Sequence, residues 1–308
     1  MTRLFEALSP ERAAKGLYWD RAWSLVQGCT PVSAACDHCW AASQAHMRAS
    51  NPNAKVAAAN AGLTVLSGDR KGAFNGHVRF NADALDIPCR TRKPQVWAVW
   101  TDLFHEQVRE QDIRYAIEDM HEAAHHTFIV LTKRPERMAQ FDMRGPNIIV
   151  GVTAENQATA NERIPHLLAT EATWRMISGE PMLGPVDLAY AAFNGADSFG
   201  QMEGIHWVVC VGETGPSARP MHPEWARSLR DQCQAAGVPF WLKSHGEWAL
   251  FRSTWRSTQP NTSKGRVFGG QFDGEELTAK LEHGASFARV GKTRAGALLD
   301  GKLWRETP

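Results

Sequence analysis

Short apolar runs alternate with amphipathic stretches along most of the chain, from Trp23 to about Gly246. Each of six runs is rich in Val, Ile and Trp and ends in polar or charged residues: QVWAVWTD, TFIVLTKR, NIIVGVTAEN, WRMISGEP, HWVVCVGET and VPFWLKSHGEW. Nearly continuous apolar runs are typical of parallel strands that are buried on both faces. A further run, AWSLVQGC, precedes these six, and we interpret it as the first strand.

The stretches between these runs predict helices. EQDIRYAIEDMHEAAHH places its apolar residues at helical spacing, and NQATANERIPHLLAT predicts a second helix. A third, HPEWARSLRDQCQAAG, ends at Gly237, a residue type that commonly terminates helices. Alternating strands and helices form right-handed βαβ units. The predicted fold class is therefore α/β, as a partial or full (β/α) barrel, and an open doubly wound sheet is the alternative.

Two regions interrupt this alternation. Residues from about 50 to 92 are rich in Ala, Asn and Gly, and we interpret them as an insertion after the first helix. Residues 249 to 308 begin with a polar stretch, RSTWRSTQPNTSKGR, and continue as short apolar pieces between glycines and charges. The predicted organisation is a barrel over residues 1–248 and a C-terminal extension over 249–308 that caps it.

Composition narrows the class of protein. The chain has 308 residues, a net charge of +1 and no run that approaches the ~20 apolar residues of a membrane span. Its N-terminus lacks the apolar core of a signal peptide. We therefore expect no membrane partner, a cytoplasmic location, and cysteines that serve as thiols or ligands. The near-zero charge argues against a basic coat but allows a local strip that binds phosphates.

The stretch GCTPVSAACDHCWA places Cys29, Cys36 and Cys39 in a C-x6-C-x2-C pattern. Structural zinc needs a fourth ligand, which His38 or His46 can supply. A thioredoxin-like redox pair would leave Cys29 without a role. Three unrelated thiols are a further alternative.

A [4Fe–4S] cluster is the interpretation that the location favours. Such a cluster normally takes four cysteines, so three leave one iron open to a ligand that is not protein. The loop follows the first predicted strand, at the rim where (β/α) barrels carry their function. We expect Thr30 to Ala35 to loop outward while the three sulfurs converge on one cluster. The other cysteines are predicted to be packing residues: Cys89, Cys210 and Cys233.

Three cysteines in this position resemble the radical S-adenosylmethionine (SAM) superfamily. The usual motif there is CxxxCxxC, and this chain keeps the closing CxxC and the aromatic Trp40 but lengthens the first gap to six residues. The chain also resembles a phage and prophage radical-SAM-like family, mostly of unassigned function, and distantly spore photoproduct lyase. The resemblance spans residues 23 to about 301 through TDLFHE, HTFIVLTKRPERM, NIIVGVTAENQATANERIP, ISGEPMLGPVDL, VGETGPSARPMHPEW, LKSHGEW and RVGKTRAGALLDG.

The resemblance implies that the three cysteines hold a [4Fe–4S] cluster and that SAM binds its open iron. The end of the second strand, Thr101 and Asp102, corresponds to the position that contacts the SAM amine in the superfamily. Other polar strand ends are expected to contact the cofactor: Lys133, Thr153, Glu155, Asn156, Ser178 and Glu180.

Further strand ends are candidates for the reaction itself and for the substrate. Candidates for proton transfer are Glu213, Lys243 and His245. Lys133 and Arg134 are candidates for holding a carboxylate or a phosphate. The loop GETGPSARPMHP has the glycines of a phosphate cradle before a helix N-terminus, with Arg219 and His222 as candidate contacts. It lacks the Lys-Ser/Thr pair of a P-loop, which argues against nucleotide hydrolysis.

Two functions are compatible with these features. The first is a radical SAM enzyme that rearranges or modifies a nucleobase, a hypermodified thymidine in phage DNA, and that receives electrons from a flavodoxin or ferredoxin. The second is a non-catalytic protein, stabilised by zinc or a cluster, that binds nucleic acid.

Overall fold

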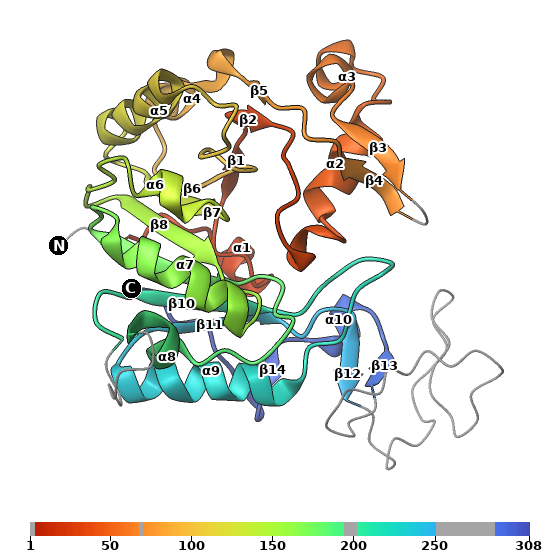
Figure 1. The fold of residues 1–308 in the computed structure, drawn as a ribbon, viewed down its shortest axis with the longest axis vertical. Helices are drawn as coiled ribbons and strands as arrows, with labels where there is room; N and C mark the ends of the chain where they lie inside the picture. The colour runs from red at the N-terminus through yellow and green to blue at the C-terminus, as the bar shows by residue number, and fades with distance from the viewer. Residues whose placement is uncertain (1–3, 68–69, 194–201, 251–286) are drawn as a thin grey trace.

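The computed structural model describes residues 4–67, 70–193, 202–250 and 287–308. Seven parallel strands form one curled sheet, and their spatial order follows the chain (Figure 1). In order they are β1 (Arg21–Trp23), β6 (Val96–Val99), β7 (Thr127–Thr132), β8 (Ile148–Thr153), β9 (Trp174–Gly179), β10 (Trp207–Val211) and β11 (Phe240–Ser244). A doubly wound sheet reverses its strand order part-way. The sequential order excludes that alternative and gives the half-barrel of a partial (β/α) barrel.

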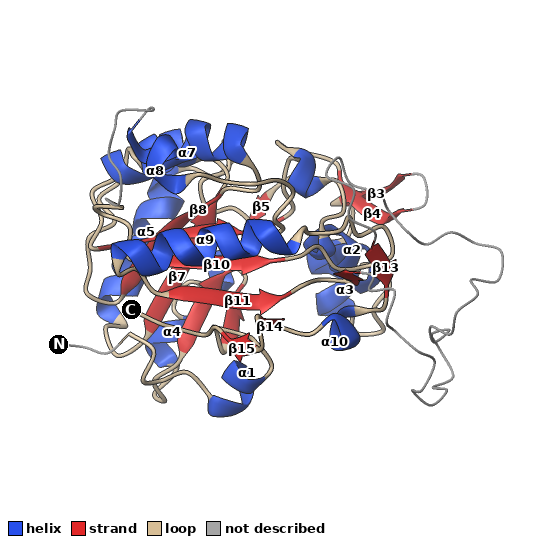
Figure 2. Ribbon diagram, turned by 90° about the horizontal axis from the view of Figure 1, so that it is seen from below, coloured by secondary structure: helices blue, strands red, loops and turns tan. Residues whose placement is uncertain are grey.

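Helices follow the strands and cover the convex face of the sheet (Figure 2). They are α5 (Glu110–Glu122), α6 (Pro135–Met138), α7 (Gln157–Ala169), α8 (Leu188–Phe193) and α9 (Pro223–Ala236). The three predicted helices are thus confirmed as α5, α7 and α9, and α9 ends at Gly237 with φ +67°. None of the described helices is both long and apolar enough to cross a bilayer.

The two faces of the sheet bury different partners, because successive strand residues point to opposite sides. The convex face packs on the helices through residues that include Val130, Val150, Ile177 and Val208. The concave face packs on Leu4 and Tyr18, which flank helix α1 (Pro10–Ala14), through Val96, Ile129, Ile149, Met176, Trp207 and Trp241. The N-terminal segment therefore fills the lower part of the half-barrel. Inward-facing positions nearer the carboxyl ends of the strands lie above it.

The predicted first strand is shorter than expected. AWSLVQGC divides into β1 and a separate strand β2 (Val26–Gln27), which pairs antiparallel with β5 (Arg79–Phe80) of the insertion. The chain thus leaves the barrel sheet after Trp23 and reaches the cysteines from a second, two-stranded sheet.

Small elements make up the insertion and the cysteine loop. The loop contains one 3₁₀ turn, η1 (Ala34–Cys36), and leads into α2 (Trp40–Arg48). The remaining elements are α3 (Ala54–Asn60), the hairpin of β3 (Thr64–Ser67) and β4 (Arg70–Phe74), the 3₁₀ turn η2 (Ala82–Ala84) and α4 (Ile87–Arg90). Helices α2 and α3 and the β3–β4 hairpin gather at the end toward which the barrel strands point (Figure 2).

The described part of the C-terminal extension protects the edge of the sheet. Its elements are β12 (Trp248–Leu250), paired with β13 (Phe287–Arg289), α10 (Lys292–Ala295), and the hairpin of β14 (Leu298–Leu299) and β15 (Lys302–Leu303). The last residues run along β11, where the Leu242 amide donates to the Trp304 carbonyl at 2.8 Å. Covering an edge strand removes a row of free backbone groups. The Ser/Thr-rich stretch of residues 252–266 lies outside the described residues.

Gly151 allows close packing on the concave face, which gives a first prediction. A Cβ at Gly151 would overlap Met176 and lie 2.8 Å from Leu131 Cδ2. We expect Gly151→Ala to lower the free energy of unfolding by about 1–3 kcal/mol through overpacking. Gly179→Ala is the matched control, because its nearest neighbour would lie 3.6 Å away. Denaturant unfolding measures both, and equal stability of the two variants would contradict the prediction.

Candidate functional site

A cavity of about 250 Å³ opens at the carboxyl ends of the barrel strands. The cysteine loop forms one wall, with Cys29, Cys36 and Cys39 all lining the same space. The strand ends form the opposite walls. Those among them that the sequence indicated are Thr101, Asp102, Lys133, Arg134, Thr153, Ser178, Glu180 and Lys243. Strand polarity and curvature thus gather residues from five strands around the three thiols.

The spacing of the three thiols bears on which metal group they can hold. Among the described residues, no set of three ligand atoms within 4.8 Å of one another includes these cysteines. A tetrahedral zinc ion with Zn–S bonds of ~2.3 Å holds its sulfurs only about 3.8 Å apart. In a cubane cluster each cysteine binds a different iron, so the sulfurs stand further apart. The described arrangement is compatible with a [4Fe–4S] cluster, whereas a single zinc ion would require the three sulfurs to lie closer together.

Each of the two histidines that could complete a zinc site makes one contact through Nδ1. His38 Nδ1 lies 3.1 Å from Glu213 Oε2, and His46 Nδ1 lies 3.1 Å from Thr64 Oγ1. Both contacts involve Nδ1 alone, so they orient the imidazole rings without excluding Nε2 as a metal ligand.

Burial favours the protonated form of two of the three thiols in the metal-free protein, Cys29 and Cys39. Burial raises the pKa of the Cys29 thiol to about 12, Asp102 adds to this shift, and Arg134 opposes it. Burial likewise raises the pKa of Cys39. Metal ions bind the thiolate, so loading of the site must release protons.

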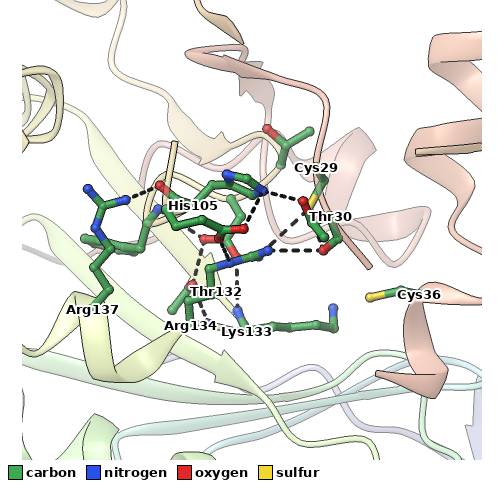
Figure 3. A network of polar contacts seen from close by, with 12 residues as sticks. Cys29, Thr30, Cys36, His105, Thr132, Lys133, Arg134 and Arg137 are labelled. Carbon is green, nitrogen blue, oxygen red and sulfur yellow. Dashed lines mark hydrogen bonds and ion pairs between the residues drawn. The ribbon is translucent and has the colours of Figure 1, made fainter. Parts of the chain in front are cut away.

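Arg134 lies between the end of β7 and the start of the cysteine loop (Figure 3). Its Nη1 lies 2.9 Å from Asp102 Oδ2 and its Nε lies 2.7 Å from Glu106 Oε2. Its Nη2 donates to the Thr30 carbonyl at 3.1 Å, and Nη1 lies 4.0 Å from Cys29 Sγ. The other Asp102 oxygen accepts from the Thr132 hydroxyl at 2.7 Å. Asp102 therefore lines the cavity but also fixes Arg134.

His105 is a site residue that the strand-end pattern did not identify. It is fully buried, and its Nε2 lies 2.8 Å from Thr30 Oγ1. Its Nδ1 accepts from the Gln107 amide at 3.2 Å, so Nε2 is the nitrogen that donates to Thr30. Burial, and then Arg134, lower the pKa of His105, which keeps the ring neutral. The signal was present in TDLFHE, where His105 follows a strand end by only a few residues.

Glu213 and Arg219 hold the other end of the cysteine loop. Glu213 accepts from Arg219 Nη2 at 2.6 Å and from Arg219 Nε at 2.9 Å, and it also faces His38. Arg219 Nη2 donates to the Ala34 carbonyl at 2.8 Å. Burial alone would raise the pKa of Glu213, but the hydrogen bonds from Arg219 and His38 outweigh it and hold the pKa below its ordinary value. Neither Glu213 nor Arg219 lines the cavity.

The wall opposite the cysteines contains polar atoms without partners. Lys243 Nζ lies 3.1 Å from Glu180 Oε2. Glu180 Oε1 and Ser178 Oγ are buried and have no hydrogen-bond partner among the described residues. Burial, and then the Glu180 carboxylate, raise the pKa of Tyr18. Buried polar atoms usually find partners, so these orphan oxygens mark positions where a ligand can bind.

Tryptophans surround the mouth of the cavity. The ring centroids of Trp40 and Trp100 lie 4.7 Å apart, and those of Trp19 and Trp100 lie 6.4 Å apart. All three line the cavity, and Trp40 is half exposed. They give the mouth a partly apolar, aromatic surface.

The remaining predicted residues lie outside the cavity wall. Glu155 is buried in an ion pair with Arg163 at 2.9 Å. Asn156 and His222 cap the N-termini of α7 and α9. His245 Nε2 lies 2.8 Å from the Leu298 carbonyl of the extension. The strand-end pattern alone does not separate rim residues from helix caps and internal ion pairs.

Comparison with known proteins places the whole site within one family. A family profile described as a protein of unknown function (DUF5131) matches residues 14–308. The chain belongs to this family. No curated protein and no solved structure matches the chain. The DUF5131 match includes the cysteine loop and every residue that lines the cavity.

The low pKa of Glu213 gives a second prediction. We expect Glu213→Gln to lower the free energy of unfolding by about 1–3 kcal/mol at pH 7, because Arg219 loses its charged partner. The carboxylate contributes above pH 4.5, its ordinary pKa, and this contribution is lost as the pH falls through the lower folded value. The difference between wild type and variant should therefore narrow at pH 3 in denaturant titrations.

Glu162→Gln on the exposed side of α7 is the control for this prediction. It should leave the free energy of unfolding unchanged at both pH values. A cost of Glu213→Gln that did not vary with pH would contradict the assigned ion pair.

Proposed function

We propose that this chain is a radical SAM enzyme whose [4Fe–4S] cluster is held by Cys29, Cys36 and Cys39. The supporting observation is that these three thiols line one cavity at the mouth of a half-barrel, together with polar residues from five strand ends. Three protein ligands leave one iron of a cubane open. When bound, the cluster and SAM would supply a 5′-deoxyadenosyl radical.

The residues around the cavity suit a ligand with both positive and negative groups. The Lys133 side chain extends toward Cys36 (Figure 3), and no carboxylate among the described residues pairs with it. It is available to hold a carboxylate. Glu180 Oε1 and Ser178 Oγ can bind donors such as an ammonium or hydroxyl group. Thr153 adds a hydroxyl to the same wall.

The proposed substrate is a nucleobase, a hypermodified thymidine in phage DNA. The resemblance to phage proteins and to spore photoproduct lyase supports it, and the tryptophans at the mouth offer stacking surfaces for a base. Of the three candidates for proton transfer, Lys243 lines the cavity, and its ammonium can donate a proton there. A flavodoxin or ferredoxin would supply the electron.

Cluster content and SAM cleavage test the proposed function. Protein purified or reconstituted without oxygen is expected to contain about four irons per chain. After reduction with SAM present, it should release 5′-deoxyadenosine, measured by chromatography and mass spectrometry. Cys36→Ala should lose iron and cleavage, whereas Cys89→Ala should keep both, because Cys89 lies on α4 away from the cavity.

Two outcomes would refute the proposed enzyme. Zinc in place of iron would support a structural metal site. Iron without SAM cleavage would leave a cluster-stabilised protein, and salt-dependent DNA binding would then point to a nucleic-acid-binding role.

The substrate assignment has its own test. Phage DNA that carries modified thymidine should raise the rate of 5′-deoxyadenosine formation, since substrate binding closes the site to water. Unmodified DNA of the same length is the control. Equal rates with both DNAs would contradict the proposed substrate and leave SAM cleavage itself intact.

A further inference from the structure

We propose that Arg134 and Arg219 are positioning residues that hold the two ends of the six-residue gap between Cys29 and Cys36. They fix the loop before any metal binds, so that its thiols already face the cavity. The inference takes from the proposed function only the assignment of the cysteines as ligands, and it does not depend on SAM chemistry.

The gap itself has little structure that could fix its shape. Pro31 and Val32 are exposed at the cavity wall, whereas Ala35 is buried, so only the middle of the stretch expected to loop outward is exposed. Its internal backbone bonds begin only at the 3₁₀ turn, where the Cys36 amide donates to the Ser33 carbonyl at 2.9 Å. A free loop of this length loses substantial conformational entropy when its ends are fixed.

Arg134 fixes the first end of the gap. Its Nη2 donates to the carbonyl of Thr30, the residue that follows Cys29. Arg134 and Thr30 are 104 residues apart in the sequence. Asp102 and Glu106 hold the guanidinium from behind at 2.9 and 2.7 Å, which leaves few alternative positions for it. His105 adds a second contact to Thr30 through its side chain at 2.8 Å.

Arg219 fixes the second end from the opposite side of the rim. Its Nη2 donates to the carbonyl of Ala34, which lies two residues before Cys36. Arg219 and Ala34 are 185 residues apart in the sequence. Glu213 holds this guanidinium through Nε and Nη2, and Asp37 of the loop lies 3.6 Å from Nη1. The same Glu213 faces His38, which precedes Cys39.

Both anchors have the same chemical design. In each, Nη2 of a planar guanidinium donates to a loop carbonyl while acidic side chains hold the same group, an arrangement that lysine cannot reproduce. The two anchored carbonyls, of Thr30 and Ala34, bracket the exposed part of the gap. The long gap is thus compatible with converging thiols because the rim, rather than the loop, sets its ends.

Site-resolved alkylation of the metal-free full-length chain tests this inference. Iodoacetamide labelling, followed by mass spectrometry of each cysteine peptide, reports how often each thiol becomes exposed. Arg219→Ala should raise the labelling rates of Cys36 and Cys39 by about tenfold, as expected for the loss of a charge-assisted hydrogen bond. Arg134→Lys should raise the rate of Cys29 by a similar factor while keeping a cation beside Asp102.

Two controls accompany these variants. Arg144 also forms an ion pair with a carboxylate, with Nη2 2.6 Å from Asp142 Oδ2, but it lies outside the cavity wall. Arg144→Ala should therefore change the labelling rate of none of the cysteines. Cys210 and Cys233 are fully buried and report on the fold within each sample.

The outcomes separate this inference from the proposed function. Unchanged rates at all three loop cysteines would overturn it. A rise that included Cys210 and Cys233 would also overturn it, because the arginines would then hold the barrel rather than the loop. Absence of SAM cleavage in the wild type would refute the proposed enzyme and leave the labelling pattern unaffected.

Discussion

The alternation of side chains across a curled parallel sheet is the constraint on which this site depends. Ile129 and Met176 are buried on the concave face. Leu131 and Ser178 lie two residues further along the same strands, so they point to the same face and line the cavity. The N-terminal segment packs mainly on the lower, apolar layer and contacts the upper layer through Tyr18, whose ring centroid lies 5.3 Å from Lys243 Nζ. The upper layer faces open space, and its side chains become the wall of a cavity. The depth of the cavity therefore depends on how much of the concave face the N-terminal segment covers. Residues from several strands, rather than from one, form its wall.

The barrel was predictable because its strands are buried on both faces, which makes each one a continuous apolar run in the sequence. The extent of the first strand was not predictable, because AWSLVQGC is equally apolar whether it forms one strand or two short strands in different sheets. Its second half pairs with Arg79–Phe80, and that partner lies more than fifty residues later. Local patterns report burial, whereas pairing depends on distant segments.

Part of the site was predictable because the carboxyl ends of parallel strands lie at the same rim of the sheet, so polar residues that follow them can line one cavity. Lys243 and Thr153 line the cavity because they continue the inward-facing positions of their strands. Asn156 also follows a strand, yet its side chain accepts from the Thr159 amide and begins a helix. Glu155 is held by Arg163, eight residues further along the chain. A polar residue after a strand can become a wall, a cap or an internal ion pair, and the choice depends on partners outside the local pattern.

The electrostatics of the cysteine wall combine two opposing needs. Burial raises the pKa of Cys29 and so disfavours an unpaired buried anion, yet the proposed metal binding would require its thiolate. Arg134 resolves this conflict through its position. It already pairs with Asp102 and Glu106 and donates to the Thr30 carbonyl, so its charge is held in place without the sulfur. Its Nη1 lies 4.0 Å from Cys29 Sγ and favours the thiolate, which lowers the pKa of Cys29 against the effect of burial. A guanidinium held by its own carboxylates can thus stabilise a neighbouring thiolate, as the proposed cluster would require.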